Sequence, residues 1–214
     1  MTDPATVLFL PGAGGSAAFW RPVAARLGLD GIFLSWPGLG HEPHEPAVRS
    51  IADLVSQVLA RMDAPVHLVA QSMGGLVAVK AALAAPDRVR RLVLVATSAG
   101  VPMADLGGAD WRPDYRRAYP RAAEWIAGHE EDLSAELPKI IAPTLLIWGD
   151  ADPISPPAVG ERLAALLPNA RLRLVRGGDH DLARNQAPQV AELVSAHLWP
   201  GGAEALTPAP SAPT

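Results

Sequence analysis

The sequence predicts an α/β fold: a three-layer α/β/α sandwich in which helices cover both faces of a doubly wound parallel sheet. Along most of the 214 residues, short apolar runs alternate with helical patterns. Repeated β-α-β alternation of this kind gives parallel strands with helices on both faces. Hydrophobic residues make up 49% and charged residues 19% of the chain, which supports one globular domain with a sizeable core.

Six apolar runs are candidate strands. The first five are almost continuously apolar, which is expected of strands buried on both faces of a parallel sheet. In and around the last run, arginines alternate with leucines, which indicates an edge strand. The predicted strands are residues 7–10, 32–34, 66–70, 92–96, 144–148 and 172–175.

The helices between the strands are marked by caps and periodicity. Ser50 can cap a helix over residues 51–62, because an aspartate follows three residues later and a single apolar stripe begins. Residues 74–85 are apolar nearly all round, which predicts a central, buried helix. Pro156 and Pro188 stand where the first turn of a helix accepts proline.

The alternation of strands and helices breaks once. Residues 98–141 show no strand pattern, and we interpret them as a small helical insertion into a single domain over residues 1–199. This insertion is either a surface excursion with its own small core or a lid over a site. Residues 200–214 are rich in proline and alanine and have no periodicity, so we expect a flexible tail.

Composition and charge exclude several function classes. The 18 Lys and Arg residues form no basic run and the formal net charge is −4, so nucleic acid is not an expected partner. The absence of cysteine excludes disulfides, Cys-ligated metals and thiol nucleophiles. No basic leader with a long apolar segment and no apolar run of membrane-spanning length is present, so we expect no membrane partner and a cytoplasmic location.

A glycine-rich stretch after the first strand, LFLPGAGGSAAFW over residues 8–20, allows two interpretations. Gly12, Gly14 and Ala17 fit the dinucleotide fingerprint, which would hold a pyrophosphate. The same glycines could instead let a backbone N–H point at a developing oxyanion. The second strand is followed by Ser35 and Trp36 rather than by a ribose-binding carboxylate, which favours the oxyanion interpretation.

The sharpest motif is VHLVAQSMGG over residues 66–75, where a buried strand passes through Ser72 into a buried helix. This is the context of a nucleophile elbow, in which small residues must stand two before and two after the serine. Ala70 and Gly74 meet that requirement. The elbow would leave the N–H of Met73 facing the site as an oxyanion donor. The alternative is that Ser72 merely caps the following helix.

Two further strand ends carry polar residues. In PTLLIWGDADPISP, Asp150 and Asp152 follow the fifth strand, and in VRGGDHDL, His180 follows the sixth. Taken singly, each of these polar residues could simply belong to a turn-rich surface loop. Together with Ser72 they give the chain order serine, aspartate, histidine, each following a strand, which is the order found in α/β-hydrolases.

On these motifs, together with LPGAGGS and SWPGLGHEP, the chain resembles the α/β-hydrolase superfamily, small serine esterase type with a reduced lid, from Thr6 to about residue 199. The resemblance implies that Asp152 is the triad acid, that Asp150 shapes its loop, and that Ala13 supplies the second oxyanion N–H. It also implies a core without the usual first two strands, hence six strands, all parallel. The short lid would fall at residues 98–141.

The resemblance implies hydrolysis of a small-molecule carboxylic ester without a cofactor, through an acyl-enzyme on Ser72. Other reactions of the same triad stay open: cleavage of C–C, thioester or lactone bonds, and perhydrolysis. A non-catalytic binding module with the same fold is a further alternative. The stretch HEPHE at residues 41–45 is interpreted as a solvated loop rather than a metal site. Three lid aromatics are candidates for substrate contact: Trp111, Tyr115 and Trp125.

Overall fold

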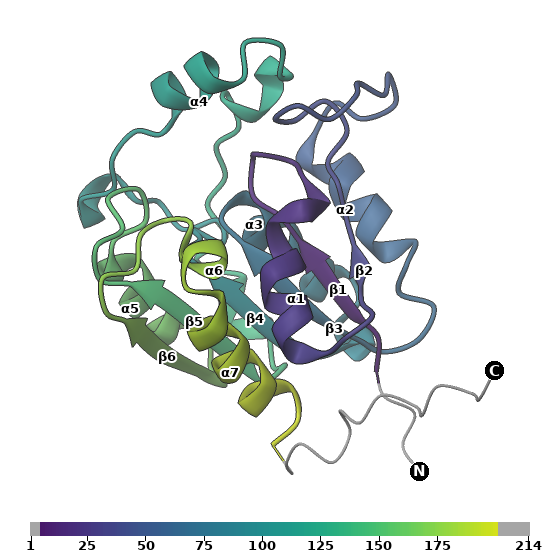
Figure 1. Cartoon of the computed structure of the whole chain (residues 1–214), viewed down its shortest axis with the longest axis vertical. Coiled ribbons are helices and arrows are strands. Elements are labelled where there is room, and N and C mark those ends of the chain that lie inside the picture. The colour runs from purple at the N-terminus through teal and green to yellow at the C-terminus, as the bar shows by residue number, and fades with distance from the viewer. Residues whose placement is uncertain (1–4, 201–214) are drawn as a thin grey trace, which may run out of the picture.

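The computed structural model describes residues 5–200, so most of the predicted tail lies outside the described residues. All six strands form one parallel sheet in the order β2-β1-β3-β4-β5-β6, as predicted (Figure 1). The order reverses at β1, which has β2 on one side and β3 on the other. The strands are β1 (Val7–Leu10), β2 (Ile32–Phe33), β3 (Val66–Gln71), β4 (Val89–Val95), β5 (Thr144–Gly149) and β6 (Ala170–Val175).

Helices cover both faces of this sheet. The helices α1 and α7 pack together on one face, and α2 packs on α3 on the other (Figure 1). Short 3₁₀ turns connect several of them. The helices are α1 (Arg21–Leu27), α2 (Ile51–Leu59), α3 (Met73–Ala84), α4 (Arg112–Ala118), α5 (Pro157–Leu166), α6 (Leu182–Asn185) and α7 (Ala187–Leu198).

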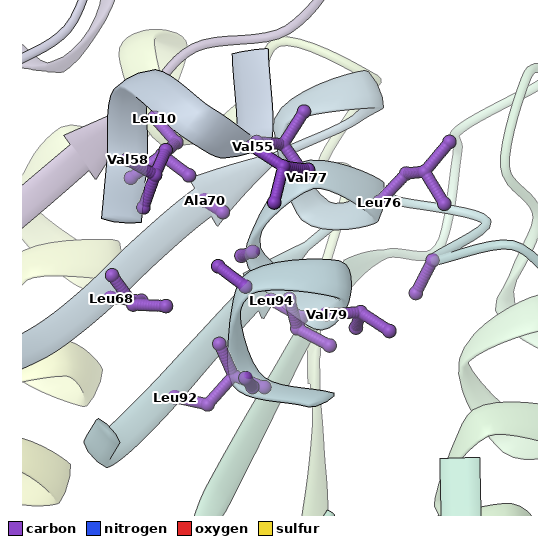
Figure 2. Close-up of a cluster of buried hydrophobic side chains, with 14 of the residues drawn as sticks. Leu10, Val55, Val58, Leu68, Ala70, Leu76, Val77, Val79, Leu92 and Leu94 are labelled. Atoms are coloured by element: carbon purple, nitrogen blue, oxygen red, sulfur yellow. The ribbon is translucent and has the colours of Figure 1, made fainter. Parts of the chain in front are cut away.

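Alternating strand residues build two separate cores. In β3, Leu68 and Ala70 point into the core beneath α2 and α3, whereas Val69 points into the core beneath α1 and α7. Figure 2 shows Leu68 and Ala70 together with Leu92 and Leu94 of β4, packed against Val77 of α3. This period-two division explains why the central strands read as continuous apolar runs, since both of their faces are buried.

The predicted caps of the helices are present. Ser50 Oγ accepts a hydrogen bond from the Asp53 N–H and donates one to the Asp53 carboxylate, which fixes the start of α2. Proline stands in the first turn of α1, α5 and α7, but in α5 this proline is Pro157, and Pro156 is the N-cap rather than a first-turn residue as predicted. The central helix begins at Met73, one residue earlier than predicted, because the chain turns into the helix directly after Ser72.

The two edges of the sheet differ from its centre. The prediction that residues 32–34 form a strand buried on both faces is wrong: β2 has only two residues, and Ile32 is 37% exposed. It pairs only with β1 and lies at the edge of the sheet, so an apolar composition alone did not bury it. At the opposite edge, β6 is an edge strand, as predicted. Its residues alternate between half-buried and exposed from Ala170 to Arg173, whereas Leu174 is 52% exposed and Val175 is buried.

The insertion at residues 98–141 contains no strand. It holds the seven-residue helix α4 and three 3₁₀ turns, at Ala104–Leu106, Glu124–Ile126 and Leu137–Lys139. In Figure 1, α4 lies at the top of the molecule, apart from the helices that cover the sheet. Backbone hydrogen bonds tie the insertion to the body: the Ala123 N–H donates to the Gly38 carbonyl at 2.7 Å, and the Ala109 N–H to the Pro153 carbonyl at 2.8 Å.

Candidate active site

Ser72 stands in a strained turn between β3 and α3. Its φ of 52° and ψ of −126° are unusual for a residue with a side chain. Its hydroxyl makes no capping hydrogen bond to α3, so the capping alternative is wrong. Non-glycine residues keep such backbone conformations only where the surrounding structure imposes them, and they concentrate at functional sites.

Close packing around the turn requires glycine at the flanking positions. A Cβ atom on Gly74 would lie 2.4 Å from the Pro11 carbonyl oxygen, and one on Gly75 would lie 2.4 Å from Thr97 Oγ1. The first contact joins the turn to the chain directly after β1. Gly74 therefore lets the serine turn lie against the start of the glycine-rich loop, and Gly75 lets it lie against Thr97.

His180 is brought to Ser72 from the loop after β6. Its Nε2 lies 2.9 Å from Ser72 Oγ, and its Nδ1 lies 2.8 Å from Asp152 Oδ2. The Asp152 side chain is completely buried, whereas that of His180 is 19% exposed. Asp152 Oδ1 accepts hydrogen bonds from the N–H groups of Ile154 and Ser155, at 2.8 and 3.0 Å. The carboxylate is thereby fixed while the ring keeps an open side.

Asp150 does not reach this cluster. Its side chain accepts a hydrogen bond of 2.6 Å from the Gly177 N–H, and the residue is exposed. This contact joins the loop after β5 to the loop after β6. The two aspartates of GDADP therefore occupy different places, with Asp152 beside His180 and Asp150 between the loops.

Two residues of this region were missed by sequence reasoning. Gln71 is 3% exposed, and its Nε2 donates to the His180 carbonyl at 3.1 Å. Thr97 is fully buried, and its Oγ1 donates to the Ser72 carbonyl at 2.5 Å while accepting from the Ala99 N–H. The sequence did carry a signal for both residues. Gln71 is a polar residue at the end of the buried strand β3, and Thr97 is a polar residue two positions after the buried strand β4.

The glycine-rich loop lies beside the serine turn. The Gly15 N–H donates to the Gly12 carbonyl at 3.0 Å, which closes a turn around Ala13. A Cβ atom on Gly12 would lie 2.4 Å from Gln71 Oε1 and 3.0 Å from Ser72 Cβ. Within residues 5–200, neither the Ala13 nor the Met73 N–H has a hydrogen-bond acceptor. Both donors are thus available to a bound group.

The loop does not open a helix as the dinucleotide fingerprint requires. The helix α1 begins only at Arg21, after the 3₁₀ turn Ala17–Trp20. In the HEPHE stretch, His44 Nε2 contacts the Arg121 carbonyl at 2.7 Å, an exposed contact to the insertion. Over the described residues, no three His, Asp or Glu side chains gather as a metal-binding group.

The three lid aromatics occupy different environments. Tyr115 is buried and hydrogen-bonded to the glycine-rich loop, with its hydroxyl 2.9 Å from the Ala13 carbonyl oxygen. Trp111 is half-buried with its ring centroid 5.3 Å from that of Tyr115. Trp125 is half-buried too, and its buried Nε1 has no partner within residues 5–200. Tyr115 is the one that is bound directly to the loop beside Ser72.

Comparison with known proteins identifies the family to which this fold belongs. The family model for the alpha/beta hydrolase fold matches residues 5–128 and 122–183. The chain therefore belongs to the alpha/beta hydrolase family, and it is an enzyme of the hydrolase class.

Individual relatives agree with this family. A relative from Stutzerimonas stutzeri (strain A1501), named "Putative carbamate hydrolase RutD", is 28% identical over 92% of this chain and 92% of its own length. A pimeloyl-acyl-carrier-protein methyl ester esterase from Shewanella woodyi is 26% identical over 76% of this chain and 80% of its own length. The crystal structure of the enol-lactonase from Burkholderia xenovorans LB400 superposes with a TM-score of 0.74, at 24% identity over 92% of both chains.

Within residues 5–200, no helix has both the length and the apolar character needed to cross a membrane.

Proposed function

We propose that the protein is a serine hydrolase that cleaves a small carboxylic ester through an acyl-enzyme on Ser72. The observation that carries the proposal is the position of one imidazole: His180 Nε2 is 2.9 Å from Ser72 Oγ, and Nδ1 is 2.8 Å from Asp152. This is the arrangement of nucleophile, base and orienting acid that activates a serine.

Acylation would use each of these groups once. The Ser72 hydroxyl gives its proton to His180 Nε2 as Oγ bonds to the ester carbonyl carbon, and the carbonyl electrons move to its oxygen. Asp152 holds the ring in the required tautomer and stabilises the imidazolium. The N–H groups of Ala13 and Met73 bind the oxyanion, and loss of one such donor typically costs about 3 kcal/mol of barrier. The tetrahedral species then expels the alcohol, which takes the proton from His180.

Deacylation would repeat the same steps with water. Water gives a proton to His180 Nε2 as its oxygen bonds to the acyl carbon, and the oxyanion again lies at Ala13 and Met73. Collapse releases the acid and returns the proton to Ser72 Oγ. No cofactor takes part in either half of this cycle.

The proposal also specifies which kind of bond is hydrolysed. An ester is supported by the methyl ester esterase among the relatives, whereas another relative is named as a putative carbamate hydrolase. The same groups could serve C–C or thioester hydrolysis or perhydrolysis, because fold and site do not by themselves fix the reaction. A substrate panel therefore belongs in the test.

The test is the intact mass of the protein after treatment with a fluorophosphonate. We expect a single adduct on the wild type and on the control Ser56→Ala, whose lost hydroxyl lies on α2 and donates to the Ala52 carbonyl. We expect none on Ser72→Ala. Short p-nitrophenyl esters, carbamates, thioesters and lactones would then rank the bond types.

A folded wild-type protein without an adduct would overturn the proposal, and the binding-module alternative would replace it. An adduct with turnover of lactones or thioesters but not esters would keep the nucleophile and change the substrate.

A further inference from the structure

Tyr115 stands where the insertion meets the glycine-rich loop. It lies on α4, is 9% exposed, and packs in the larger core. Its ring is part of an aromatic row along the helix, with centroids 5.3 Å from Trp111 and 5.0 Å from Tyr119. These contacts hold the ring and leave its hydroxyl aimed at the body of the protein.

The Tyr115 hydroxyl joins two loops. It donates to the Ala13 carbonyl at 2.9 Å and accepts from the Gly40 N–H at 3.1 Å. The two loops also touch directly, since a Cβ atom on Gly40 would lie 2.0 Å from the Gly14 carbonyl oxygen. Gly40 has a φ of +57°, so glycine is needed there both for the conformation and for the contact.

These bonds fix two successive peptide groups around Ala13. The Gly12 carbonyl belongs to the same planar peptide as the Ala13 N–H, and it is held by the Gly15 N–H. The Ala13 carbonyl belongs to the next peptide and is held by Tyr115. With both planes fixed, the backbone of Ala13 has no free rotation left, and its N–H keeps one direction.

We propose that Tyr115 is a positioning residue that orients the Ala13 N–H toward the oxyanion. The rate of hydrolysis then depends on the position of α4 against the glycine-rich loop. The inference rests on the proposed function. The hydroxyl has already used its one hydrogen on Ala13, so it cannot also donate a hydrogen bond to a substrate. The insertion thereby influences the rate of the chemical step through the glycine-rich loop beside Ser72. A substrate that displaces α4 would change the orientation of the Ala13 N–H.

The hydroxyl is suited to a permanent donor role. Burial raises the pKa of Tyr115 above its ordinary value, so the phenol stays protonated throughout the neutral pH range. The donor to Ala13 is therefore present throughout this pH range.

The experiment compares Tyr115→Phe with Tyr119→Phe on a p-nitrophenyl ester. Tyr115→Phe keeps the ring and removes only the hydroxyl that Ala13 and Gly40 share. We expect kcat to fall about tenfold with KM nearly unchanged, since a misaimed oxyanion donor weakens transition-state rather than ground-state binding. Binding of a trifluoromethyl ketone, which forms an oxyanion on Ser72, should weaken by the same factor. Tyr119 Oη has no hydrogen-bond partner within residues 5–200, so its variant should match the wild type.

The outcomes separate this inference from the proposed function. A wild type that forms no fluorophosphonate adduct fails the proposed function itself. A normal adduct together with a Tyr115→Phe variant of unchanged kcat overturns the positioning role alone. A rise in KM without loss of kcat would also overturn it and would favour direct substrate contact.

A second measurement covers the case in which Tyr115→Phe does not fold. The chain has only two tyrosines, so 3-fluorotyrosine labelling gives two fluorine signals, and Tyr119→Phe assigns them. Phosphonylation of Ser72 places an oxygen at the Ala13 N–H and should shift the Tyr115 signal. A Tyr115 signal that stays in place would count against the coupling.

Discussion

Asp152 is buried behind His180, and the two side chains meet through one contact of 2.8 Å between Oδ2 and Nδ1. The second carboxylate oxygen is occupied by the backbone N–H groups of Ile154 and Ser155. With both oxygens engaged, the carboxylate has one orientation, and the imidazole that it holds has one too. The loop after β5 thus determines where the His180 ring presents Nε2.

The first prediction concerns Asp152→Asn. The amide oxygen can still accept from Ile154 and Ser155, so the fold should persist, but the NH₂ group cannot accept a hydrogen bond from the His180 Nδ1–H. The ring then takes the wrong tautomer, and kcat should fall by roughly 10³- to 10⁴-fold. Steady-state kinetics on a p-nitrophenyl ester would measure it.

Asp150→Asn is the matched control, because it makes the same chemical change in the same loop. Asp150 contacts the Gly177 N–H rather than His180. Its kcat should stay within about twofold of wild type, because the amide oxygen of Asn can still accept from the Gly177 N–H. Equal losses in the two variants would contradict the division of roles between the aspartates.

The second prediction concerns Gln71, which holds the carbonyl of His180 from the end of β3. Gln71→Leu keeps the volume and removes the donor. Leaving that carbonyl without its partner should lower the free energy of unfolding by about 1 kcal/mol. A loosened His180 should lower kcat by about tenfold, since small misplacements of reacting groups are costly.

Asn169→Leu removes a similar contact elsewhere, from Asn169 Nδ2 to the Ile141 carbonyl, where both residues precede their strands. It should affect urea unfolding without affecting kcat. If Gln71→Leu behaved in the same way, Gln71 would have only a structural role.

The third prediction concerns Gly74→Ala. The added methyl group meets the carbonyl oxygens of Pro11 and Leu10 at 2.4 and 2.7 Å, and backbone atoms cannot move aside as a side chain could. We expect a loss of about 1–3 kcal/mol in the free energy of unfolding. Fluorophosphonate labelling should also slow, because the glycine-rich loop is pushed away from Ser72.

Gly28→Ala separates strain from crowding. Gly28 has a φ of +63° at the end of α1, with no atom within 4 Å of an added Cβ. Its cost should be roughly 1–2 kcal/mol from the left-handed backbone alone. Labelling at the wild-type rate in this variant, and also in Gly74→Ala, would show that the contact with Pro11 does not position the loop.

Much of this architecture could be predicted from the sequence, because its signals are local. A buried parallel strand reads as an apolar run, and the turn at Ser72 demands small neighbours that are visible in AQSMGG. The exposure of β2 could not be predicted in this way, since Ile32 and Phe33 are as apolar as central strand residues. Ile32 is exposed and Phe33 only half-buried because β2 lies at the edge of the sheet.

Two contacts between distant segments, outside the predicted triad, were also beyond the sequence. Gln71 and His180 are 109 residues apart, and Tyr115 and Ala13 are 102 apart. Neither pair has a periodicity or a motif that would join its members. The polar character of Gln71 could have marked it as functional, whereas Tyr115 reads as an ordinary aromatic until its hydroxyl is seen to bind a loop.

The last prediction concerns stability at acid pH and rests on His67 in β3. The residue is 5% exposed, and its Nδ1 has no partner within residues 5–200. Burial, and then the positive charges of Arg91 and Arg90, lower the pKa of His67 from 6.5 to about 4. Between pH 4 and pH 6.5, His67 is mostly protonated in the unfolded chain but mostly neutral in the folded chain. The free energy of unfolding therefore rises with pH across this range.

Acidification from pH 6.5 to pH 4 should therefore cost roughly 3 kcal/mol of unfolding free energy through this group alone. His67→Leu removes the titrating ring and should flatten the dependence of urea unfolding on pH. Some slope will persist, because burial also lowers the pKa of His197. Measurements at pH 8, where the ring is neutral in both states, give the packing effect of the substitution and allow it to be subtracted. A variant with the wild-type slope would mean that His67 gains a proton in the folded protein without penalty.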